Sequence, residues 1–326
     1  MRILCVLPSW IGDAVMVSGA LAALTDRHPE ARLTLAVGPA AAGLFADWPR
    51  VDEIIILKKR PYAGHWFGLW AKTVARRWDV VMDVRGSGLA YALWAHTRHV
   101  YRRQDRFQDL HKTWETGSLL GLDQPLLPKI YISEARREHA ARLTAGDGPI
   151  LAIAPMANWV GKTWPLDHYI TLVKRLLRTP ELEGARLMTV GGPADQGVCD
   201  SLQQAVLPEQ RLQLAGQVDL LTSTACLAHA RLYVGNDSGP THLAAMAGAP
   251  TLALYGPTND KRYGPPQAQA RIVRTKRDYE WYQAQGAHLG DDTLWMLDLD
   301  VATVERAALS LLEETTPTPT PELTHV

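Results

Sequence analysis

The stretch PMANWVGKTWP, residues 155–165, places a lysine in a setting that resembles a phosphate-binding loop. Gly161, Lys162 and Thr163 match the end of the P-loop pattern G-x-x-x-x-G-K-[ST], whose first glycine lets consecutive backbone N–H groups face the phosphates. Here that first position is Met156, and methionine does not adopt the positive φ that glycine takes freely. The sequence therefore excludes a P-loop NTPase. Lys162 is either a point-charge contact for phosphate in another setting or an exposed loop lysine.

A second candidate anion site lies in VGNDSGPTHLAAMAGAPTLALYGPT, residues 234–258. Its start predicts a tight turn and then a helix, with Pro240 near the first helical position, where a missing N–H costs nothing. Free N–H groups at such a helix start bind anions, and nearby side chains can add donors. A purely structural helix explains Ser-Gly-Pro but not the Asp, Thr and His beside it, so we favour a binding role. The candidate residues are Asp237, Ser238, Gly239, Thr241 and His242.

Asp13 follows the first apolar run, in PSWIGDAVM, residues 8–16, and opens a predicted helix. One interpretation is an N-cap aspartate, which is among the commonest uses of this residue. The other is a general base that takes a proton from an attacking hydroxyl. A helix N-terminus favours the ionised carboxylate, so Asp13 would be charged at pH 7 in either role. The sequence leaves both roles open.

Basic residues gather in the first half of the chain, where residues 1–150 hold 20 Lys and Arg against 15 Asp and Glu. This excess suggests an anionic partner, but it is too small to indicate nucleic acid. The alternative for each residue is a solvated charged face. Those that could contact an anionic acceptor are Lys58, Lys59, Arg60, Arg102 and Arg103.

Other signals argue against metal and dinucleotide sites. The stretch 191–197, GGPADQG, lacks the G-x-G-x-x-G spacing of dinucleotide folds. The D-x-D at 298–300 precedes the last predicted helix, so a helix cap is the better interpretation. The 11 histidines show no metal-ligand spacing. We predict no metal ligands.

The length of 326 residues suggests two domains. Cys5, Cys199 and Cys226 form no CxxC pattern and are odd in number, which favours a reducing compartment. No apolar stretch reaches the ~18 residues of a membrane span, and the first residues, MRILCVLPSW, do not resemble a signal peptide. We expect a cytoplasmic protein that can still contact a membrane surface.

Apolar runs alternate with amphipathic stretches, which is typical of parallel sheets covered by helices on both faces. About ten strands in two sets of five predict an α/β protein with two Rossmann-like domains. Predicted strands are 2–7, 32–37, 53–57, 80–84, 150–154, 186–190, 211–215, 231–235, 251–255 and 271–274. Predicted helices are 13–27, 66–77, 134–144, 166–178, 219–229, 240–247 and 301–313.

Glycine and proline at 144–149 mark the expected boundary between domains 1–148 and 149–314. The repeated Thr-Pro of residues 315–326 cannot build a helix or a strand ladder, so we predict a disordered tail.

Three motifs in this order resemble glycosyltransferase family 9, the bacterial heptosyltransferases, and most closely the second heptosyltransferase type. They are IGDAVM at 11–16, K-x-W-P at 162–165 and GNDSGPTHLAA…P…ALYGPT at 235–258. The resemblance covers nearly the whole chain and implies a GT-B fold, with an N-terminal acceptor domain, a C-terminal nucleotide-sugar domain and a last helix that crosses back. It also implies inverting transfer of heptose from ADP-heptose to a Kdo or heptose sugar of the lipid-linked inner core, with no obligatory metal or other cofactor.

Carried over residue by residue, the resemblance makes Asp13 the general base and Lys162 a contact of the donor diphosphate. It places Asp237 near the heptose hydroxyls, and it implies that the turn and helix start, with Ser238, Gly239, Thr241 and His242, bind the phosphates. Lys261 and Arg262 are unassigned. The alternatives are another nucleotide sugar or acceptor, a nucleotide-sugar-binding protein without catalysis, and an NAD-dependent oxidoreductase, against which the missing fingerprint argues.

Overall fold

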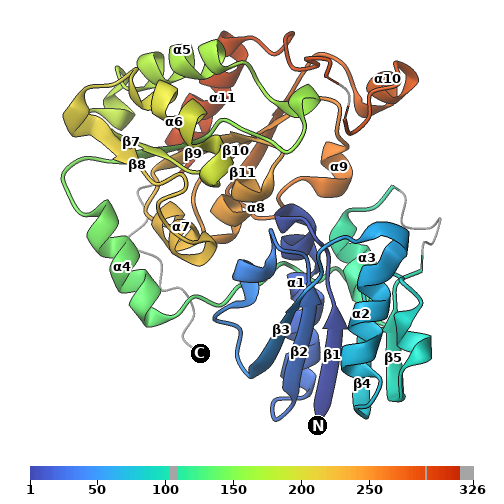
Figure 1. Ribbon diagram of the computed structural model, residues 1–326. Helices are drawn as coiled ribbons and strands as arrows, with labels where there is room; N and C mark the ends of the chain where they lie inside the picture. Colours follow the sequence, from blue (N-terminus) through green and yellow to red (C-terminus); the bar gives the residue numbers. More distant parts are fainter. Residues whose placement is uncertain (103–108, 291, 316–326) are drawn as a thin grey trace. The chain divides into compact units, whose positions relative to one another are not determined.

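The computed structural model describes residues 1–102, 109–290 and 292–315, and contacts within the chain divide it into two units. The first unit is Met1–Ile132, and the second begins at Ser133. Each unit has one parallel sheet covered by helices (Figure 1). This confirms the predicted α/β class with two Rossmann-like domains.

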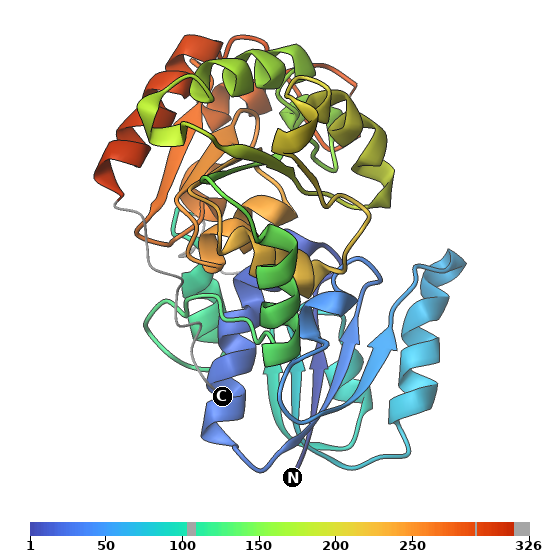
Figure 2. The same ribbon diagram turned by 90° about the vertical axis from the view of Figure 1, so that its left-hand side faces the viewer.

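The first unit has a five-stranded sheet in the order β3-β2-β1-β4-β5. Its strands are β1 (Arg2–Val6), β2 (Arg32–Val37), β3 (Val51–Ile56), β4 (Trp78–Asp83) and β5 (Ala95–Val100). Its α-helices are α1 (Ile11–Arg27), α2 (Gly64–Thr73) and α3 (Lys112–Leu119). The central strands are buried on both faces of the sheet, so helices must cover each face. Helix α1 lies on one face and α2 on the other (Figure 2).

The second unit has a six-stranded sheet in the order β11-β10-β9-β6-β7-β8. Its strands are β6 (Ile150–Ala154), β7 (Arg186–Thr189), β8 (Arg211–Gln213), β9 (Leu232–Asn236), β10 (Thr251–Tyr255) and β11 (Ala270–Arg274). Its longer helices are α4 (Glu134–Thr144), α5 (Leu166–Leu176), α6 (Gln196–Gln203), α7 (Leu220–Leu227), α8 (Gly239–Met246) and α11 (Val301–Glu314). The short α9 (Asp260–Tyr263) and α10 (Tyr279–Ala284) follow β10 and β11.

The core of the second unit joins its sheet to two helices far apart in the sequence. Leu172 of α5 and Leu311 of α11 belong to one buried apolar cluster with Leu151 and Val234 of the central strands. The helix that ends the described chain therefore packs on the second unit. Its predicted return to the first domain stays a prediction.

Each sheet contains a topological switch point, where the chain stops adding strands on one side and begins on the other. In the first unit β1 pairs with β2 on one side and with β4 on the other. In the second unit β6 pairs with β7 and with β9 in the same way. Ligands of open α/β sheets bind beyond the carboxyl ends of the strands at this point. We therefore expect the functional side chains after β1, β4, β6 and β9.

All ten predicted strands are present, but the division into two sets of five is wrong, because the sheets of the described residues have five and six strands. The missing strand is β5, whose sequence AHTRHV is polar and only partly buried. Its position at the edge of the sheet explains this composition, since an edge strand needs little apolar cover. Helices α3 and α6 were also not predicted.

The predicted domain boundary at 148/149 stays a prediction. Contacts assign α4, which precedes this boundary, to the second unit, where Arg136 pairs with Asp219 before α7. Residues 316–326 of the predicted tail lie outside the described residues.

Candidate functional site

A buried cluster of three charged or polar side chains stands at the switch point of the second sheet. Lys162 ends the short 3-10 helix Val160–Lys162 after β6, and its Nζ lies 3.4 Å from Oδ2 of Asp237, which follows β9. Nε2 of His242, in α8, lies 3.6 Å from the other carboxylate oxygen, Oδ1. The exposed fractions of these side chains are 14%, 9% and 6%. The structure thus brings together three residues predicted from two separate motifs.

Asn236, the last residue of β9, fixes the loop that carries Lys162. Its side chain is fully buried, and its Nδ2 donates to the carbonyl of Pro155 at 2.9 Å. Its Oδ1 accepts from the backbone N–H of Trp164 at 2.9 Å. The indole of Trp164 is itself buried and donates to the carbonyl of Leu299 at 2.8 Å. Both ends of the loop are therefore tied to β9, and sequence reasoning missed this role of Asn236.

Replacing Asn236 by alanine should lower the free energy of unfolding by about 2–4 kcal/mol, because two buried backbone groups lose their partners. Urea unfolding measures this loss. Asn259, which caps α9 by accepting from the N–H of Arg262 at 3.0 Å, is the matched control. Its alanine variant should lose only about 1 kcal/mol. Equal losses would contradict the role given to Asn236.

The start of α8 has the predicted form, with Ser238 at the N-cap and Pro240 in the first turn. The hydroxyl of Thr241 donates to the carbonyl of Asn236 and lies 3.0 Å from the hydroxyl of Tyr233. These bonds hold the turn, so the hydroxyl of Thr241 is used inside the protein. Pro240 has no N–H, and the N–H groups of Thr241 and His242 donate to the carbonyl of Ser238 at 3.2 and 3.4 Å. This turn therefore offers an anion the N–H of Gly239 and the positive end of the helix dipole.

One buried polar atom at this turn, Nδ1 of His242, has no hydrogen-bond partner in the part of the chain that the structure describes. The hydroxyl of Ser238 interacts with Tyr233, and that of Thr258, which follows the neighbouring strand β10, interacts with the carboxylate of Asp237. Buried polar atoms are normally satisfied, so each one in a native protein requires an explanation. A ligand with an oxygen atom at this position could pair with Nδ1 of His242.

Opposing influences set the ionisation of Asp237. Burial disfavours its charged form, but the ammonium of Lys162 and the side chain of His242 outweigh burial and hold the pKa of Asp237 well below its usual range. The carboxylate is therefore ionised at neutral pH. Its ion pair with Lys162 holds the ammonium of that lysine beside the start of α8.

This depressed pKa predicts where acid should act on stability. An unfolded Asp has a pKa of about 3.9, so the contribution of Asp237 is complete above about pH 5 and is lost as the pH falls toward the folded pKa. Asp237→Asn should flatten the dependence of the unfolding free energy on pH between about pH 5 and 2. Urea unfolding across this window measures it. Asp147→Asn, at an exposed carboxylate before β6, should leave the wild-type slope.

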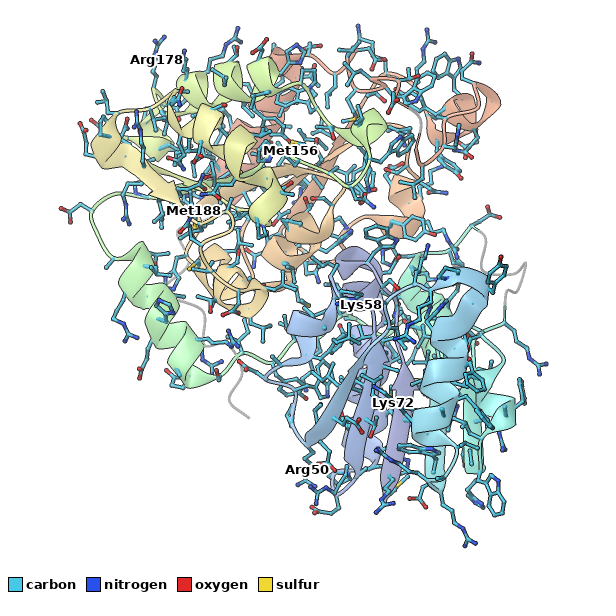
Figure 3. All side chains as sticks on the ribbon, in the orientation of Figure 1. Arg50, Lys58, Lys72, Met156, Arg178 and Met188 are labelled. Atoms are coloured by element: carbon cyan, nitrogen blue, oxygen red, sulfur yellow. The ribbon has the colours of Figure 1, made fainter. Side chains whose placement is uncertain are left out.

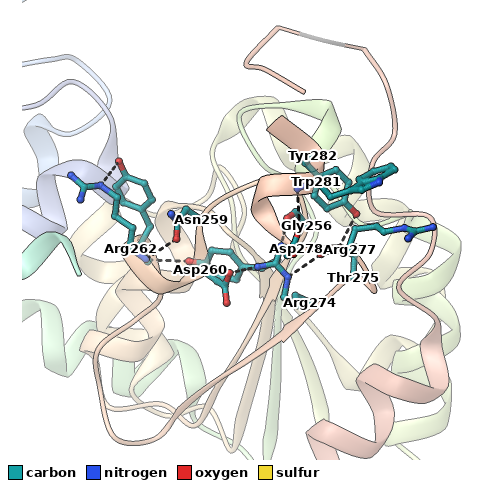
Figure 4. Close-up of polar contacts among 12 residues, drawn as sticks. Gly256, Asn259, Asp260, Arg262, Arg274, Thr275, Arg277, Asp278, Trp281 and Tyr282 are labelled. Atoms are coloured by element: carbon teal, nitrogen blue, oxygen red, sulfur yellow. Dashed lines mark hydrogen bonds and ion pairs between the residues drawn. The ribbon is translucent and has the colours of Figure 1, made fainter. Parts of the chain in front are cut away.

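The loops after β10 and β11 are joined by Arg274, the last residue of β11 (Figure 4). Its guanidinium pairs with Asp260 and donates to the carbonyls of Gly256 at 2.9 Å and Arg277 at 3.1 Å. Sequence reasoning missed Arg274, although a charged residue at the carboxyl end of a predicted strand was a usable signal. Arg262 donates to the hydroxyl of Tyr263 at 3.3 Å.

Asp13 lies in the first unit, in the first turn of α1 and directly beyond β1. The N-cap position is Trp10, so Asp13 is the third residue of the helix and not its cap. Its side chain is exposed. The loop before Asp13 packs closely against Gly38, which follows β2. A Cβ on Gly38 would lie only 2.5 Å from Cα of Ser9 in this loop. Asp13 therefore stands at the switch point of the first sheet.

The predicted basic residues lie at two separate places in the first unit. Lys58, Lys59 and Arg60 are exposed beyond β3, and Figure 3 shows Lys58 at the carboxyl end of this strand. Arg102 follows β5 and donates to the hydroxyl of Tyr91 at 2.9 Å. Because β3 and β5 are the outer strands, the sheet order keeps these two groups apart. Arg103 lies outside the described residues.

Two further predictions concern metal ions and membranes. Among the described residues no group of three His, Cys, Asp or Glu could hold a metal ion. Asp300 instead caps α11 by accepting from the N–H of Thr303 at 2.8 Å. In the same described ranges, no helix has both the length and the apolar character needed to cross a membrane.

Comparisons with known proteins agree with this architecture. The model of glycosyltransferase family 9 (heptosyltransferase) matches residues 82–286. The chain is 25% identical to lipopolysaccharide heptosyltransferase 2 of Salmonella typhimurium, over 96% of this chain and 99% of that protein. It is 26% identical to the Escherichia coli protein of the same name, over 86% and 89%.

Solved structures show the same fold. The structure of E. coli ADP-heptose LPS heptosyltransferase II has a TM-score of 0.73 at 23% identity, covering 96% of this chain and 99% of that one. E. coli heptosyltransferase WaaC with ADP has a TM-score of 0.70 at 18% identity, covering 95% and 100%. These similarities confirm the predicted GT-B class.

Proposed function

The chain belongs to glycosyltransferase family 9, and from this premise we propose that it moves heptose from ADP-heptose to a sugar of the lipopolysaccharide inner core with inversion. Family membership makes the protein a glycosyltransferase, as the three sequence motifs predicted. The names of its relatives support the acceptor. The solved structures of WaaC with ADP and with ADP-2-deoxy-2-fluoro heptose support the donor.

The observation that carries the proposal is the buried Lys162–Asp237–His242 cluster beside the start of α8. A cation and a helix N-terminus at one switch point suit a diphosphate, and Nδ1 of His242, which has no partner among the described residues, supplies a further contact for its oxygen atoms. In this proposal Lys162, Ser238, Gly239 and His242 contact the phosphates, whereas the hydroxyl of Thr241 holds the turn. Asp237 accepts hydrogen bonds from heptose hydroxyls and orients Lys162.

The chemistry is a single displacement. Asp13 accepts the proton of the acceptor hydroxyl, whose oxygen forms a bond to the anomeric carbon of heptose while the bond from that carbon to the diphosphate oxygen breaks. ADP leaves with the electron pair of the broken bond. Lys162, the N–H of Gly239 and the positive end of the α8 dipole stabilise the charge that develops on the leaving diphosphate. One displacement inverts the anomeric centre and needs no covalent intermediate.

The proposed acceptor is anionic and lipid-linked, which gives the exposed basic residues of the first unit a role. Lys58, Lys59, Arg60 and Arg102 would contact its carboxylates or phosphates. We place the reaction at the cytoplasmic face of the inner membrane. Phe67, which is 69% exposed, is a side chain that suits a membrane interface.

Transfer assays test the proposal. ADP-heptose, UDP-glucose and GDP-mannose would each be offered with lipopolysaccharide acceptors truncated at successive inner-core sugars, with and without EDTA. We expect EDTA-insensitive transfer from ADP-heptose to one truncation only. Transfer from another donor, or to another acceptor, would make the chain a family-9 transferase of different specificity. Binding of ADP-heptose without transfer to any acceptor would make it a nucleotide-sugar-binding protein.

A further inference from the structure

The loop after β4 is built around the buried carboxylate of Asp83, the last residue of that strand. Its Oδ1 accepts from the N–H of Arg85 at 3.0 Å, and its Oδ2 accepts from the N–H and the hydroxyl of Ser87 at 2.9 and 2.7 Å. Gly86 has a φ of +60°, and a Cβ there would lie 2.8 Å from the carbonyl oxygen of Tyr101. These contacts hold the loop, and with it the backbone of Arg85, in the observed conformation.

The guanidinium of Arg85 is half-buried and lies over the ring of Trp66 of α2, with 4.8 Å between Cζ and the ring centroid. Within the described ranges of the chain it makes no hydrogen bond and no ion pair. The carboxylate of Asp83 does not supply one, because its oxygens accept from backbone and hydroxyl groups. Burial lowers the pKa of Arg85, and the charge of Asp83 opposes this. A partly desolvated guanidinium with unused donors calls for an anion.

Two other cations of this unit, Arg98 and Lys112, are used within the protein. Arg98 donates to the carbonyls of Ala90 and Leu93 at 2.8 and 2.9 Å. Lys112 pairs with Glu115. Arg85 differs from both because its guanidinium lies over the ring of Trp66, and its N–H groups have no partner among the described residues.

The position of Arg85 identifies the ligand. Val6 of β1 and Asp83 of β4 are register partners, and the N–H of Val84 donates to the carbonyl of Val6 at 3.0 Å. The loop that carries Arg85 thus leaves the sheet beside the loop that leads to Asp13. These two loops flank the switch point of the first sheet, where a ligand of this unit should bind.

We propose that Arg85 is an acceptor-binding residue, which holds a carboxylate or phosphate of the acceptor while Asp13 takes the proton of the reacting hydroxyl. This inference rests on the proposed function and adds, to the exposed basic residues named there, an anion-binding residue beside Asp13. The planar fork of arginine binds two oxygens of such a group at once, and this fixes the sugar in orientation as well as in place.

Steady-state kinetics of Arg85→Met and Arg85→Lys test the proposal, with Arg77→Met as the matched control. Arg77 also stacks on a tryptophan, Trp94, at 5.6 Å, but it precedes β4 and so lies at the opposite edge of the same sheet. We expect the methionine variant to raise the KM for the acceptor about 10- to 100-fold and to leave the KM for the donor unchanged. The acceptor KM of Arg85→Lys should lie between those of the wild type and Arg85→Met. The acceptor KM of Arg77→Met should equal that of the wild type.

Modified acceptors distinguish the two anions. If Arg85 binds a phosphate, the wild type and Arg85→Met should have equal KM values on a dephosphorylated acceptor. If it binds a carboxylate, they should become equal on an acceptor whose carboxyl groups are reduced. An unchanged acceptor KM for Arg85→Met on the unmodified acceptor, or an equal rise in donor KM, would overturn the proposal.

The failure of the proposed function would be visible separately, as an absence of transfer by the wild type. In that case calorimetry with the deacylated inner-core oligosaccharide tests Arg85 directly. Weaker binding by Arg85→Met than by Arg77→Met supports the anion site, and equal binding excludes it.

Discussion

Replacement of Asp13 by asparagine should lower kcat about 10²- to 10⁴-fold, because asparagine cannot accept the proton of the acceptor hydroxyl. The affinity for ADP should not change, since the proposed diphosphate contacts belong to the second unit. The swap keeps the shape of the side chain. Asp13 is not the N-cap of α1, so the loss of its charge should cost the helix only about 0.3–1 kcal/mol of dipole stabilisation.

Rapid-quench transfer assays with saturating donor and acceptor measure kcat, and calorimetry with ADP measures the affinity. Asp26→Asn is the control, because Asp26 is an exposed aspartate near the other end of α1. It should retain wild-type kcat. A loss of only severalfold in Asp13→Asn would show that Asp13 is a first-turn helix residue and that another group is the base.

The sequence was most informative where strands are apolar on both faces. Such strands have no other stable place than the middle of a covered sheet, so their ranges could be predicted closely, as with Arg32–Val37 and Thr251–Tyr255. β5 was missed because an edge strand has one neighbour and tolerates His, Thr and Arg. To predict β5 as a strand, one needs to know that it pairs with β4, and the spacing of apolar residues in the sequence does not show this pairing.

The candidate site was predictable to the extent that its residues follow strands directly. Lys162 and Asp237 are 75 positions apart in the chain, and their proximity follows from the pairing of β6 with β9. Asn236 could not be assigned, because its role depends on two backbone groups of a distant loop. The same limit applies to Arg85, because its proposed role depends on its contact with the side chain of Trp66 in α2. Lys58 and Arg102 lie apart because they follow the two outer strands of the sheet, and the composition of the first half of the chain could not predict this separation.

Replacement of Lys162 by methionine should raise the Kd for ADP about 10- to 100-fold, the usual effect of losing a charged contact. It should also destabilise the protein, because Asp237 keeps its buried charge and loses the ammonium that lies 3.4 Å from its Oδ2. Breaking a buried pair in this way costs roughly 3 kcal/mol. Calorimetry with ADP and urea unfolding measure the two effects. An unchanged ADP affinity would remove Lys162 from the site.

The double variant Lys162→Met, Asp237→Asn separates binding from folding. Removing both charges eliminates the uncompensated carboxylate, so the unfolding free energy should return close to the wild-type value. The affinity for ADP should stay as weak as in Lys162→Met, because the cation that contacts the diphosphate is still missing. If the double variant instead recovered ADP affinity together with stability, the weak binding of Lys162→Met would be a consequence of local unfolding. Lys162 would then be a structural partner of Asp237, and the diphosphate would depend on the start of α8 and His242.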